Sequence, residues 1–556
     1  MEVLHIEDLS FAYPECDGLA VDSVNFSLNS GDFAVVCGAS GCGKTTLLRL
    51  LKRELAPHGK MSGRIFYCGV LQDELDGMTS ASEIGFVLQN PDSQIVTDKV
   101  WHELAFGLEN LGLPTETVRR RVGEMASYFG IESWFRRSTD ELSGGQKQLL
   151  NLAAVMVMQP KVLILDEPTS QLDPIAAADF IATLKRLNRE LGLTVIIAEH
   201  RLEEVFPMAD NVLVMDMGHL AVFDSPRNVG DRLRQIREDH PMLMGLPSAV
   251  RIFGALGADG DCPLTVREGR DFLEQRFVRG GAMPEHEYSH RDEVALEFKN
   301  VWFRYERDLP DILRGTSFKV YSGEIYCILG GNGTGKTTTL NVTAGLNKAY
   351  RGKVTVGGKP IGSYRGNSLY RNNLTLLPQD PQCVFIKDTV RADLSDILGY
   401  MGISADERKK RIDAVSARVG TSHLLDKNPL DLSGGEVQKC AIAKMLLLEP
   451  KILLLDEPTK GLDSASKQAL RGILRELALG GMTVVIVTHD VEFAAQSSDR
   501  CALFFDGEIL SSDVPTRFFS ENNFYTTAAN RMARNICRNA VTCEQVVGFC
   551  KGEGNR

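Results

Sequence analysis

Gly38-Ala39-Ser40-Gly41-Cys42-Gly43-Lys44-Thr45-Thr46 is the stretch that decides the fold, and it recurs as Gly330-Gly331-Asn332-Gly333-Thr334-Gly335-Lys336-Thr337-Thr338. Both copies match the pattern G-x-x-x-x-G-K-[ST], follow a short apolar run and open a helix-like segment. Glycines here let backbone N–H groups close around phosphate oxygens, and the start of a helix adds partial positive charge. The lysine neutralises the outer phosphates, and the threonine hydroxyl reaches Mg²⁺. The stretch therefore predicts two nucleoside triphosphate sites, each on a strand–loop–helix unit.

Further landmarks recur at nearly the same spacing, which indicates a tandem duplication. They are residues 142–146 (again at 432–436), residues 162–169 (again at 452–459) and His200 (again as His489). We therefore expect one domain at residues 1–240 and a second at 293–520. The Gly-rich, charged stretch 241–292 predicts an irregular appendage and linker, and residues 521–556 form a short mixed tail.

Each repeat has the pattern of an α/β fold. Short apolar runs at residues 33–37, 162–165 and 194–198 predict buried strands, and amphipathic segments between them predict helices. This alternation favours a mainly parallel sheet with flanking helices, the architecture of a P-loop NTPase.

Bulk composition narrows the function classes. The 556 residues are 43% hydrophobic and carry a formal net charge of −11, which argues against a bulk electrostatic partnership with nucleic acid. The residues Met1-Glu2-Val3-Leu4-His5 do not have the pattern of a signal peptide, and no apolar run is long enough to span a bilayer. We therefore expect that action at a membrane needs a separate spanning subunit. The 12 cysteines are scattered without a C-x-x-C pair, which favours reduced thiols over disulfides or a metal cluster.

A pair of acidic residues ends an apolar run in each repeat. Four apolar residues lead into Asp166-Glu167 and into Asp456-Glu457. The aspartate suits the Mg²⁺ shell, and the glutamate is placed to polarise the attacking water. Phosphoryl transfer needs this combination of positioning and charge neutralisation.

The segments Leu142-Ser143-Gly144-Gly145-Gln146 and Leu432-Ser433-Gly434-Gly435-Glu436 resemble the signature sequence of ATP-binding-cassette (ABC) ATPases. Physically, a serine and two glycines that open a helix offer donors to a γ-phosphate. The resemblance implies two ABC-type domains, each with a helical signature subdomain. It also implies head-to-tail pairing inside the chain, with two ATP molecules, each with Mg²⁺, held between one domain's P-loop and the other's signature.

The remaining family positions are present. Gln89 and Gln379 match the Q-loop glutamine, His200 and His489 match the switch histidine, and Tyr13 and Tyr305 match the aromatic residue that stacks on adenine. Residues 170–173 and 460–463 match the D-loops.

The resemblance thus implies two hydrolytic sites. The catalytic residues are Glu167, Glu457, His200, His489, Gln89 and Gln379. The metal ligands are Thr45, Gln89, Asp166, Thr337, Gln379 and Asp456. The nucleotide contacts are Tyr13, Gly38, Ser40, Gly41, Gly43, Lys44, Thr45, Thr46, Ser143, Gly144, Gly145, Tyr305, Gly330, Asn332, Gly333, Gly335, Lys336, Thr337, Thr338, Ser433, Gly434 and Gly435. In the first site Lys44 faces Ser433 and Gly435, and in the second Lys336 faces Ser143 and Gly145.

Residues 86–110 are similar to the ATPases of energy-coupling-factor importers, which take up vitamins or transition-metal ions. The carriers of this likeness are Asn90-Pro91-Asp92-Ser93-Gln94-Ile95-Val96 and Glu103-Leu104-Ala105-Phe106-Gly107-Leu108-Glu109-Asn110. The resemblance implies two partners, an integral membrane coupling subunit and a substrate-binding membrane subunit. It also implies a peripheral place on the cytoplasmic face of the cell membrane. Residues 94–108 are apolar with interspersed acids, and we hypothesise that they form the docking groove for the membrane partner.

Three alternatives compete with this interpretation. A two-cassette ATPase acting on the ribosome carries a long basic linker, whereas residues 241–292 have mixed charge. The fused ATPase of a sugar importer often has one degraded site, whereas both sites here are complete. His286-Glu287-Tyr288-Ser289-His290 fits the zinc pattern H-E-x-x-H, but Gly280, Gly281 and Pro284 precede it and no apolar helical stripe surrounds it, so we expect no metal there.

Overall fold

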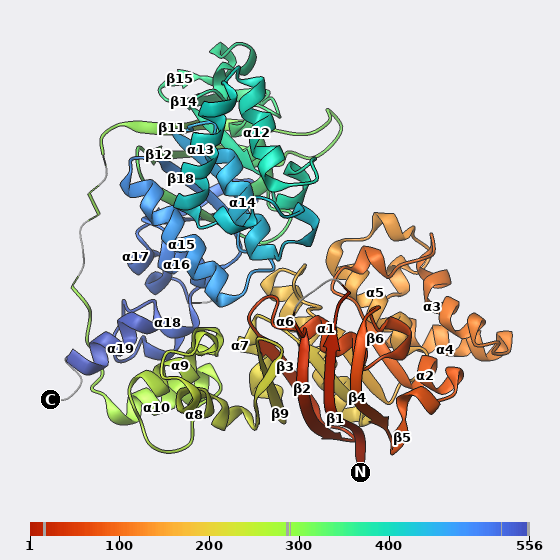
Figure 1. Ribbon diagram of the computed structural model, residues 1–556. Helices are drawn as coiled ribbons and strands as arrows, with labels where there is room; N and C mark the ends of the chain where they lie inside the picture. The colour runs from red at the N-terminus through yellow and green to blue at the C-terminus, as the bar shows by residue number, and fades with distance from the viewer. Residues whose placement is uncertain (15–17, 285–287, 290, 524, 553–556) are drawn as a thin grey trace. The chain divides into compact units, whose positions relative to one another are not determined.

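The computed structural model describes residues 1–14, 18–284, 288–289, 291–523 and 525–552. Contacts divide these residues into two compact units. The first holds Met1–Gly254 and Asp259–Thr265, and the second holds Ala255–Ala258 and Val266–Arg556. In Figure 1 the colour passes from red to yellow-green through the first unit and from green to blue through the second.

The first unit contains two sheets. The antiparallel sheet has the order β2-β1-β4-β5 and the larger sheet has the order β10-β9-β3-β8-β7-β6. Only β10 runs antiparallel to its neighbour in the larger sheet. The strands are β1 (Glu2–Ala12), β2 (Val21–Asn29), β3 (Phe33–Gly38), β4 (Lys60–Tyr67), β5 (Val70–Leu71), β6 (Ile84–Val87), β7 (Val162–Asp166), β8 (Thr194–Ala198), β9 (Asn211–Asp216) and β10 (His219–Asp224).

The apolar runs of the sequence form the centre of the larger sheet. Every residue of β3, β7 and β8 is buried, as expected for parallel strands covered on both faces. Because these strands run the same way, their carboxyl ends bring the glycine-rich loop, Asp166 and His200 to one edge. The predicted α/β fold with a mainly parallel sheet is confirmed.

Helices cover the sheet and form a separate lobe. Helix α1 packs on β3, β7 and β8, whereas α3, α4 and α5 pack on one another and stand together in Figure 1. The helices are α1 (Lys44–Leu50), α2 (Gly77–Glu83), α3 (Val100–Asn110), α4 (Thr115–Tyr128), α5 (Gly144–Met156), α6 (Pro174–Leu191), α7 (Leu202–Val205), α8 (Pro226–Ile236) and α9 (Ser248–Ala255). The signature segment opens α5 and so belongs to this helical lobe.

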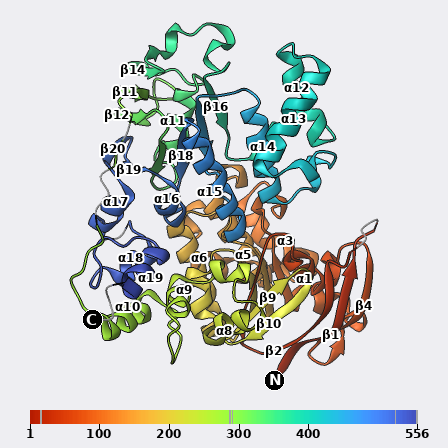
Figure 2. The ribbon, with the colours of Figure 1, turned by 60° about the vertical axis from the view of Figure 1, so that its left-hand side comes forward.

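The second unit repeats both sheets, in the orders β12-β11-β14-β15 and β16-β17-β18-β13-β19-β20. Its strands are β11 (Val294–Phe303), β12 (Leu313–Tyr321), β13 (Ile325–Leu329), β14 (Arg351–Val356), β15 (Lys359–Pro360), β16 (Leu374–Leu377), β17 (Ile452–Asp456), β18 (Thr483–Thr488), β19 (Arg500–Phe505) and β20 (Glu508–Asp513). Its helices are α10 (Val266–Arg276), α11 (Lys336–Thr343), α12 (Val390–Tyr400), α13 (Ala405–Val419), α14 (Gly434–Leu446), α15 (Ser464–Leu479), α16 (Val491–Ser497), α17 (Pro515–Glu521), α18 (Ala528–Ala533) and α19 (Cys543–Gly552). Helices α12, α13 and α14 form the second helical lobe (Figure 2).

The stretches 241–292 and 521–556 contain helices that the sequence analysis does not predict. Helix α9 is held to the first unit because Glu203 accepts a hydrogen bond of 2.9 Å from the Ser248 N–H. Helix α10 packs on α18 in the second unit, where the Arg270 guanidinium donates to the Arg531 carbonyl at 2.9 Å. These helices have 6 to 11 residues, too few for periodicity to distinguish them from loops.

Within the described residues, no helix combines the length and the apolar character needed to cross a bilayer.

We expect substitution of Gly352, a glycine in β14, to cause a large loss of stability. Gly352 has φ +91°, and a Cβ atom there would lie 2.2 Å from the Asn300 carbonyl oxygen. Because that atom is backbone, Gly352→Ala should lower the free energy of unfolding of the second unit by about 2–4 kcal/mol. Calorimetric unfolding measures this effect. Gly358→Ala is the control, since Gly358 also has positive φ but open space around it, and an equal loss in both variants would contradict the account.

Candidate functional site

The two glycine-rich loops have matching geometry. In each, the lysine side chain is buried and folds back onto its own loop, with Lys44 Nζ 2.9 Å from the Gly38 carbonyl and Lys336 Nζ 2.9 Å from the Gly330 carbonyl. Gly43 has φ +101°, and a Cβ atom there would lie 2.2 Å from the Ala20 carbonyl. Only glycine fits this turn, which aims the first N–H groups of α1 into the loop.

The threonine after each lysine contacts the acid that ends the neighbouring strand. Thr45 donates to Asp166 at 3.0 Å, and Thr337 donates to Asp456 at 3.2 Å. A hydroxyl and a carboxylate oxygen side by side are the oxygen donors that Mg²⁺ prefers.

Glu167, the glutamate predicted to be catalytic in the first unit, contacts a glutamine and a histidine. Glu167 accepts a hydrogen bond of 2.8 Å from Gln89, and its other carboxylate oxygen lies 2.8 Å from His200 Nε2. The predicted glutamate, Q-loop glutamine and switch histidine of the first unit therefore lie together. The histidine and glutamine fix where the carboxylate points, as positioning of a water molecule requires.

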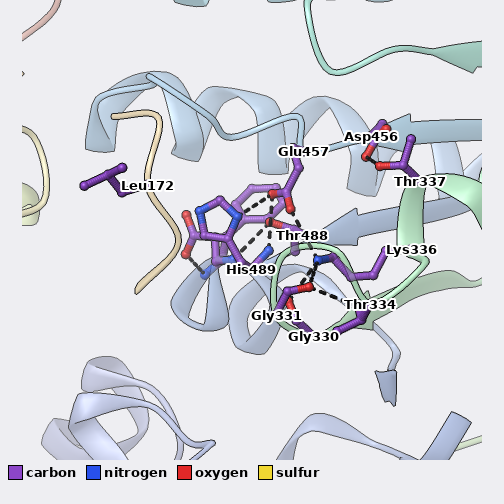
Figure 3. Close-up of polar contacts among 12 residues, drawn as sticks. Leu172, Gly330, Gly331, Thr334, Lys336, Thr337, Asp456, Glu457, Thr488 and His489 are labelled. Carbon is purple, nitrogen blue, oxygen red and sulfur yellow. Dashed lines mark hydrogen bonds and ion pairs between the residues drawn. The ribbon is translucent and has the colours of Figure 1, made fainter. Parts of the chain in front are cut away.

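The second glutamate has a different set of partners (Figure 3). Glu457 lies 2.9 Å from His489 Nδ1 and 4.0 Å from Lys336 Nζ. Burial alone would raise the pKa of Glu457, but the hydrogen bond and charge of His489 outweigh it and hold that pKa below its usual value. Gln379 is exposed, and its side chain makes no hydrogen bond to any described residue. Gln89 thus contacts the glutamate of the first site, whereas the equivalent Gln379 makes no hydrogen bond to Glu457.

Both glutamates have a rare backbone conformation. Glu167 has φ +43° and Glu457 has φ +47°, in the left-handed region that costs energy for residues other than glycine. Each turn is held by a backbone hydrogen bond from the glutamate N–H to the adjacent strand, at Ala198 and Val487. The same backbone conformation therefore recurs at the matching position of each unit, directly after the aspartate that ends the strand.

The two tyrosines lie at the starts of the P-loop helices. The Tyr13 hydroxyl is 3.0 Å from Thr46 Oγ1, and the Tyr305 hydroxyl is 3.3 Å from Thr338 Oγ1. Each ring stands edge-on to a phenylalanine, Phe11 or Phe303. This places each predicted adenine contact next to the loop predicted to hold the phosphates.

The signature serines begin α5 and α14. Ser143 and Ser433 are the N-cap residues, and the following glycines supply the first N–H groups of each helix. The D-loop aspartates cap the next helices, where Asp173 accepts from the Ala176 N–H and Asp463 from the Ser466 N–H. The pairing of each signature with the other unit's P-loop is a relation between units and stays a prediction.

One acidic residue near the first site is missing from the sequence prediction. Glu199 precedes His200, is buried and accepts a hydrogen bond of 2.9 Å from the Thr169 N–H. Burial raises the pKa of Glu199 to about 7. The second unit has Thr488 at this position. The sequence contains this difference between the units, because Ala198-Glu199-His200 of the first corresponds to Val487-Thr488-His489 of the second.

The two aspartates that contact the P-loop threonines, Asp166 and Asp456, have raised pKa values. Burial raises the pKa of Asp166 to about 6, and the charge of Glu167 adds to the shift. Burial likewise raises the pKa of Asp456 to about 6. Each carboxylate is therefore costly to ionise in the folded protein until a cation approaches it.

A pH dependence of stability follows. Because Asp166 holds its proton more tightly in the folded state, stability falls as pH rises from about 4 to about 6, and the cost persists above. Asp166→Asn should therefore raise the free energy of unfolding at pH 8 by up to about 3 kcal/mol, with no gain at pH 4. Thermal unfolding of the nucleotide-free chain at both pH values measures this effect, with exposed Asp73→Asn as control. An equal gain at pH 4 and pH 8 would contradict the assignment.

The H-E-x-x-H segment is the one metal-like pattern that the sequence analysis weighs. His286, Glu287 and His290 lie outside the described residues. Among the residues that are described, no cluster of three or more His, Cys, Asp or Glu side chains is arranged to hold a metal ion.

Comparisons with known proteins identify the family of the chain. The ABC transporter family profile matches residues 21–170 and 313–460. A Bacillus anthracis protein named "Putative ABC transporter ATP-binding protein" is 40% identical over 556 residues, 99% of this chain and 98% of its own length. A Methanosarcina acetivorans protein of the same name is 31% identical, over 93% of this chain and 86% of its own length. The solved structure of cbiO1 from Clostridium perfringens, described as part of the ABC transporter complex cbiONQ, is 32% identical, with a TM-score of 0.39, and covers 41% of this chain and 92% of that one.

The matches cover both copies of the P-loop, and the relatives match nearly the whole chain. The chain belongs to the ABC transporter family and is an ATPase with two ATP-binding cassettes.

Proposed function

We propose that this chain hydrolyses ATP at two sites to energise the import of a small solute, a vitamin or a transition-metal ion, through a separate membrane complex. The partners are an integral membrane coupling subunit and a substrate-binding membrane subunit, so the chain works as a peripheral protein on the cytoplasmic face. The observation that carries the proposal is a loop with an exposed apolar side chain, which lies shortly after the Q-loop glutamine in each cassette. This docking loop contains Val96 and Thr97 in the first cassette and Ile386 and Lys387 in the second.

In the first cassette this loop is held by one carboxylate. Glu103 on α3 accepts hydrogen bonds from the N–H groups of Val96 and Thr97, at 3.1 and 2.9 Å. The Glu103 side chain is buried, whereas Val96 is 63% exposed and Trp101 is 43% exposed. A carboxylate that holds an apolar side chain out into water favours a docking surface over a solvated loop.

In the second cassette an aspartate, Asp393, holds the equivalent loop in the same way. Asp393 on α12 accepts from the N–H groups of Ile386 and Lys387, at 3.0 and 2.9 Å, and pairs with Lys444 at 2.7 Å. Ile386 is 75% exposed. Two cassettes with the same fixed, apolar loop suit two coupling segments of a membrane partner.

The same loop is tied to the catalytic edge of the first cassette. Gln94 accepts a hydrogen bond from the Leu88 N–H and donates one to the Phe86 carbonyl. Gln89 follows Leu88 directly and contacts Glu167. Movement of the docking loop therefore reaches the catalytic carboxylate through a few bonds, as coupling of transport to hydrolysis requires.

The chain's own groups account for hydrolysis. Lys44 and Lys336 leave their loop carbonyls to neutralise the outer phosphates, and the helix N-termini add N–H donors. Glu167 and Glu457 accept a hydrogen bond from the attacking water, and His200 and His489 hold those carboxylates in place. Closing the cassettes around two ATP molecules and reopening them after hydrolysis makes a clamp.

The residues also fit Mg²⁺. Thr45 with Asp166, and Thr337 with Asp456, each present two adjacent oxygen donors. Gln89 is the further ligand that we assign to the first site, and Gln379 would have to turn from its exposed position to serve the second. When bound, Mg²⁺ neutralises phosphate charge.

Affinity purification from native membranes tests the proposal. The tagged chain with Glu167→Gln and Glu457→Gln should carry integral membrane subunits with it, identified by mass spectrometry. Val96→Asp with Ile386→Asp should lose those subunits but keep ATP binding, whereas Val278→Asp, an exposed valine elsewhere, should keep both. Ribosomal proteins in place of membrane subunits would overturn the importer function and leave the ATPase intact.

A further inference from the structure

The two signature serines differ in how their hydroxyl protons are used. The Ser433 hydroxyl donates to the Glu436 carboxylate at 2.8 Å, and the Ser433 N–H donates to the same oxygen at 2.9 Å. In the first cassette the residue equivalent to Glu436 is Gln146. There the Ser143 hydroxyl accepts from the Gln146 N–H at 3.3 Å, and its proton makes no hydrogen bond to any described residue.

The backbone N–H of the signature serine has the same kind of partner in both cassettes. Gln146 Oε1 accepts from the Ser143 N–H at 3.0 Å, as Glu436 does from Ser433. A neutral amide therefore satisfies the capping function. The carboxylate adds a negative charge, and no cation pairs with it among the described residues.

That charge lies beside the group expected to contact a γ-phosphate. A phosphate oxygen that accepts from the Ser433 hydroxyl must displace Glu436 from it, and the two anions then repel at close range. Ser143 has a free proton and a neutral neighbour, so the equivalent contact has neither cost.

We propose that Glu436 weakens ATP-driven closure at the site that the second cassette's signature completes, so that the two ATP sites are unequal. This rests on the proposed head-to-tail pairing, in which Ser433 faces Lys44 and Ser143 faces Lys336. Glu436 is then a specificity-determining residue that sets the order in which the sites close, with the site at Lys336 closing at lower ATP concentration.

The test isolates each site in the purified full-length chain. The background carries Glu167→Gln and Glu457→Gln to stop turnover, and Lys336→Ala leaves only the site at Lys44. In that background Glu436→Gln should lower the half-saturating ATP concentration about fivefold, and Gln146→Glu should leave it unchanged. With Lys44→Ala instead, Gln146→Glu should raise that concentration about fivefold and Glu436→Gln should have no effect.

ADP supplies the readout that a capping role alone would not change. Because ADP lacks the γ-phosphate, Glu436→Gln should leave ADP affinity unaltered while it tightens ATP binding. Unchanged ATP affinity in both backgrounds, or equal gains for ATP and ADP, would overturn the role of Glu436. A gain in the Lys44→Ala background would instead contradict the proposed pairing of cassettes, and neither result depends on the membrane partner.

Discussion

We expect the Glu167→Gln, Glu457→Gln variant to lose ATP turnover by about 10²–10⁴-fold while it retains ATP binding. Each glutamate directly follows a buried strand, has positive φ and lies within 2.9 Å of a histidine ring nitrogen. Glutamine keeps the size of the side chain but cannot polarise water as a carboxylate does.

Steady-state phosphate release and equilibrium ATP binding measure the two parts of this prediction. Each single variant should retain part of the turnover, because each cassette contains one glutamate. Glu508→Gln, on the exposed side of β20, should behave like the unmodified chain. Turnover in the double variant close to that of the unmodified chain would exclude these residues as the catalytic carboxylates.

Lys44→Ala and Lys336→Ala should each lower ATP affinity at their own site by about 10- to 100-fold. Both lysines are buried, and the ammonium group of each donates hydrogen bonds to two carbonyls of its own glycine-rich loop. Each ammonium group therefore lies within the loop that is predicted to bind phosphate. Alanine removes the one mobile positive charge of the loop.

Titration with labelled ATP measures this loss. The double lysine variant should bind no ATP at concentrations that saturate the unmodified chain. Thermal unfolding serves as the folding control, and Lys359→Ala, on exposed β15, serves as the affinity control. Two sites of unaltered affinity in the double variant would contradict the role assigned to these lysines.

Much of the fold follows from short motifs in the sequence. The runs at residues 33–37 and 162–165 are entirely apolar, which predicts strands buried on both faces. The structure confirms this for β3 and β7. The recurrence of these motifs predicts two domains of one fold, and each unit has the same two sheets.

Other features depend on packing that periodicity does not encode. Helices α10 and α18 are short, and each is stabilised by its contacts with the other, so neither has a strong pattern of its own. The choice of ring nitrogen also differs, since His200 faces its glutamate with Nε2 and His489 with Nδ1. A motif specifies a histidine but not its rotamer.

The sequence difference behind the proposed inequality of the two sites is one residue, Gln146 against Glu436. Both side chains accept from the N–H of the signature serine, and only the structure shows that Glu436 also accepts a hydrogen bond from the Ser433 hydroxyl. Glu199 and Thr488 likewise differ at one position beside otherwise matching histidines.

The most direct test of the account counts occluded ATP in chains that combine one P-loop variant with one signature variant. In the Glu167→Gln, Glu457→Gln background, Lys44→Ala with Ser433→Arg should damage one composite site and leave one ATP per chain after rapid gel filtration. Lys44→Ala with Ser143→Arg should damage both sites and leave none. The reverse pattern, none in the first variant and one in the second, would show that each cassette completes its own site and would contradict the head-to-tail clamp.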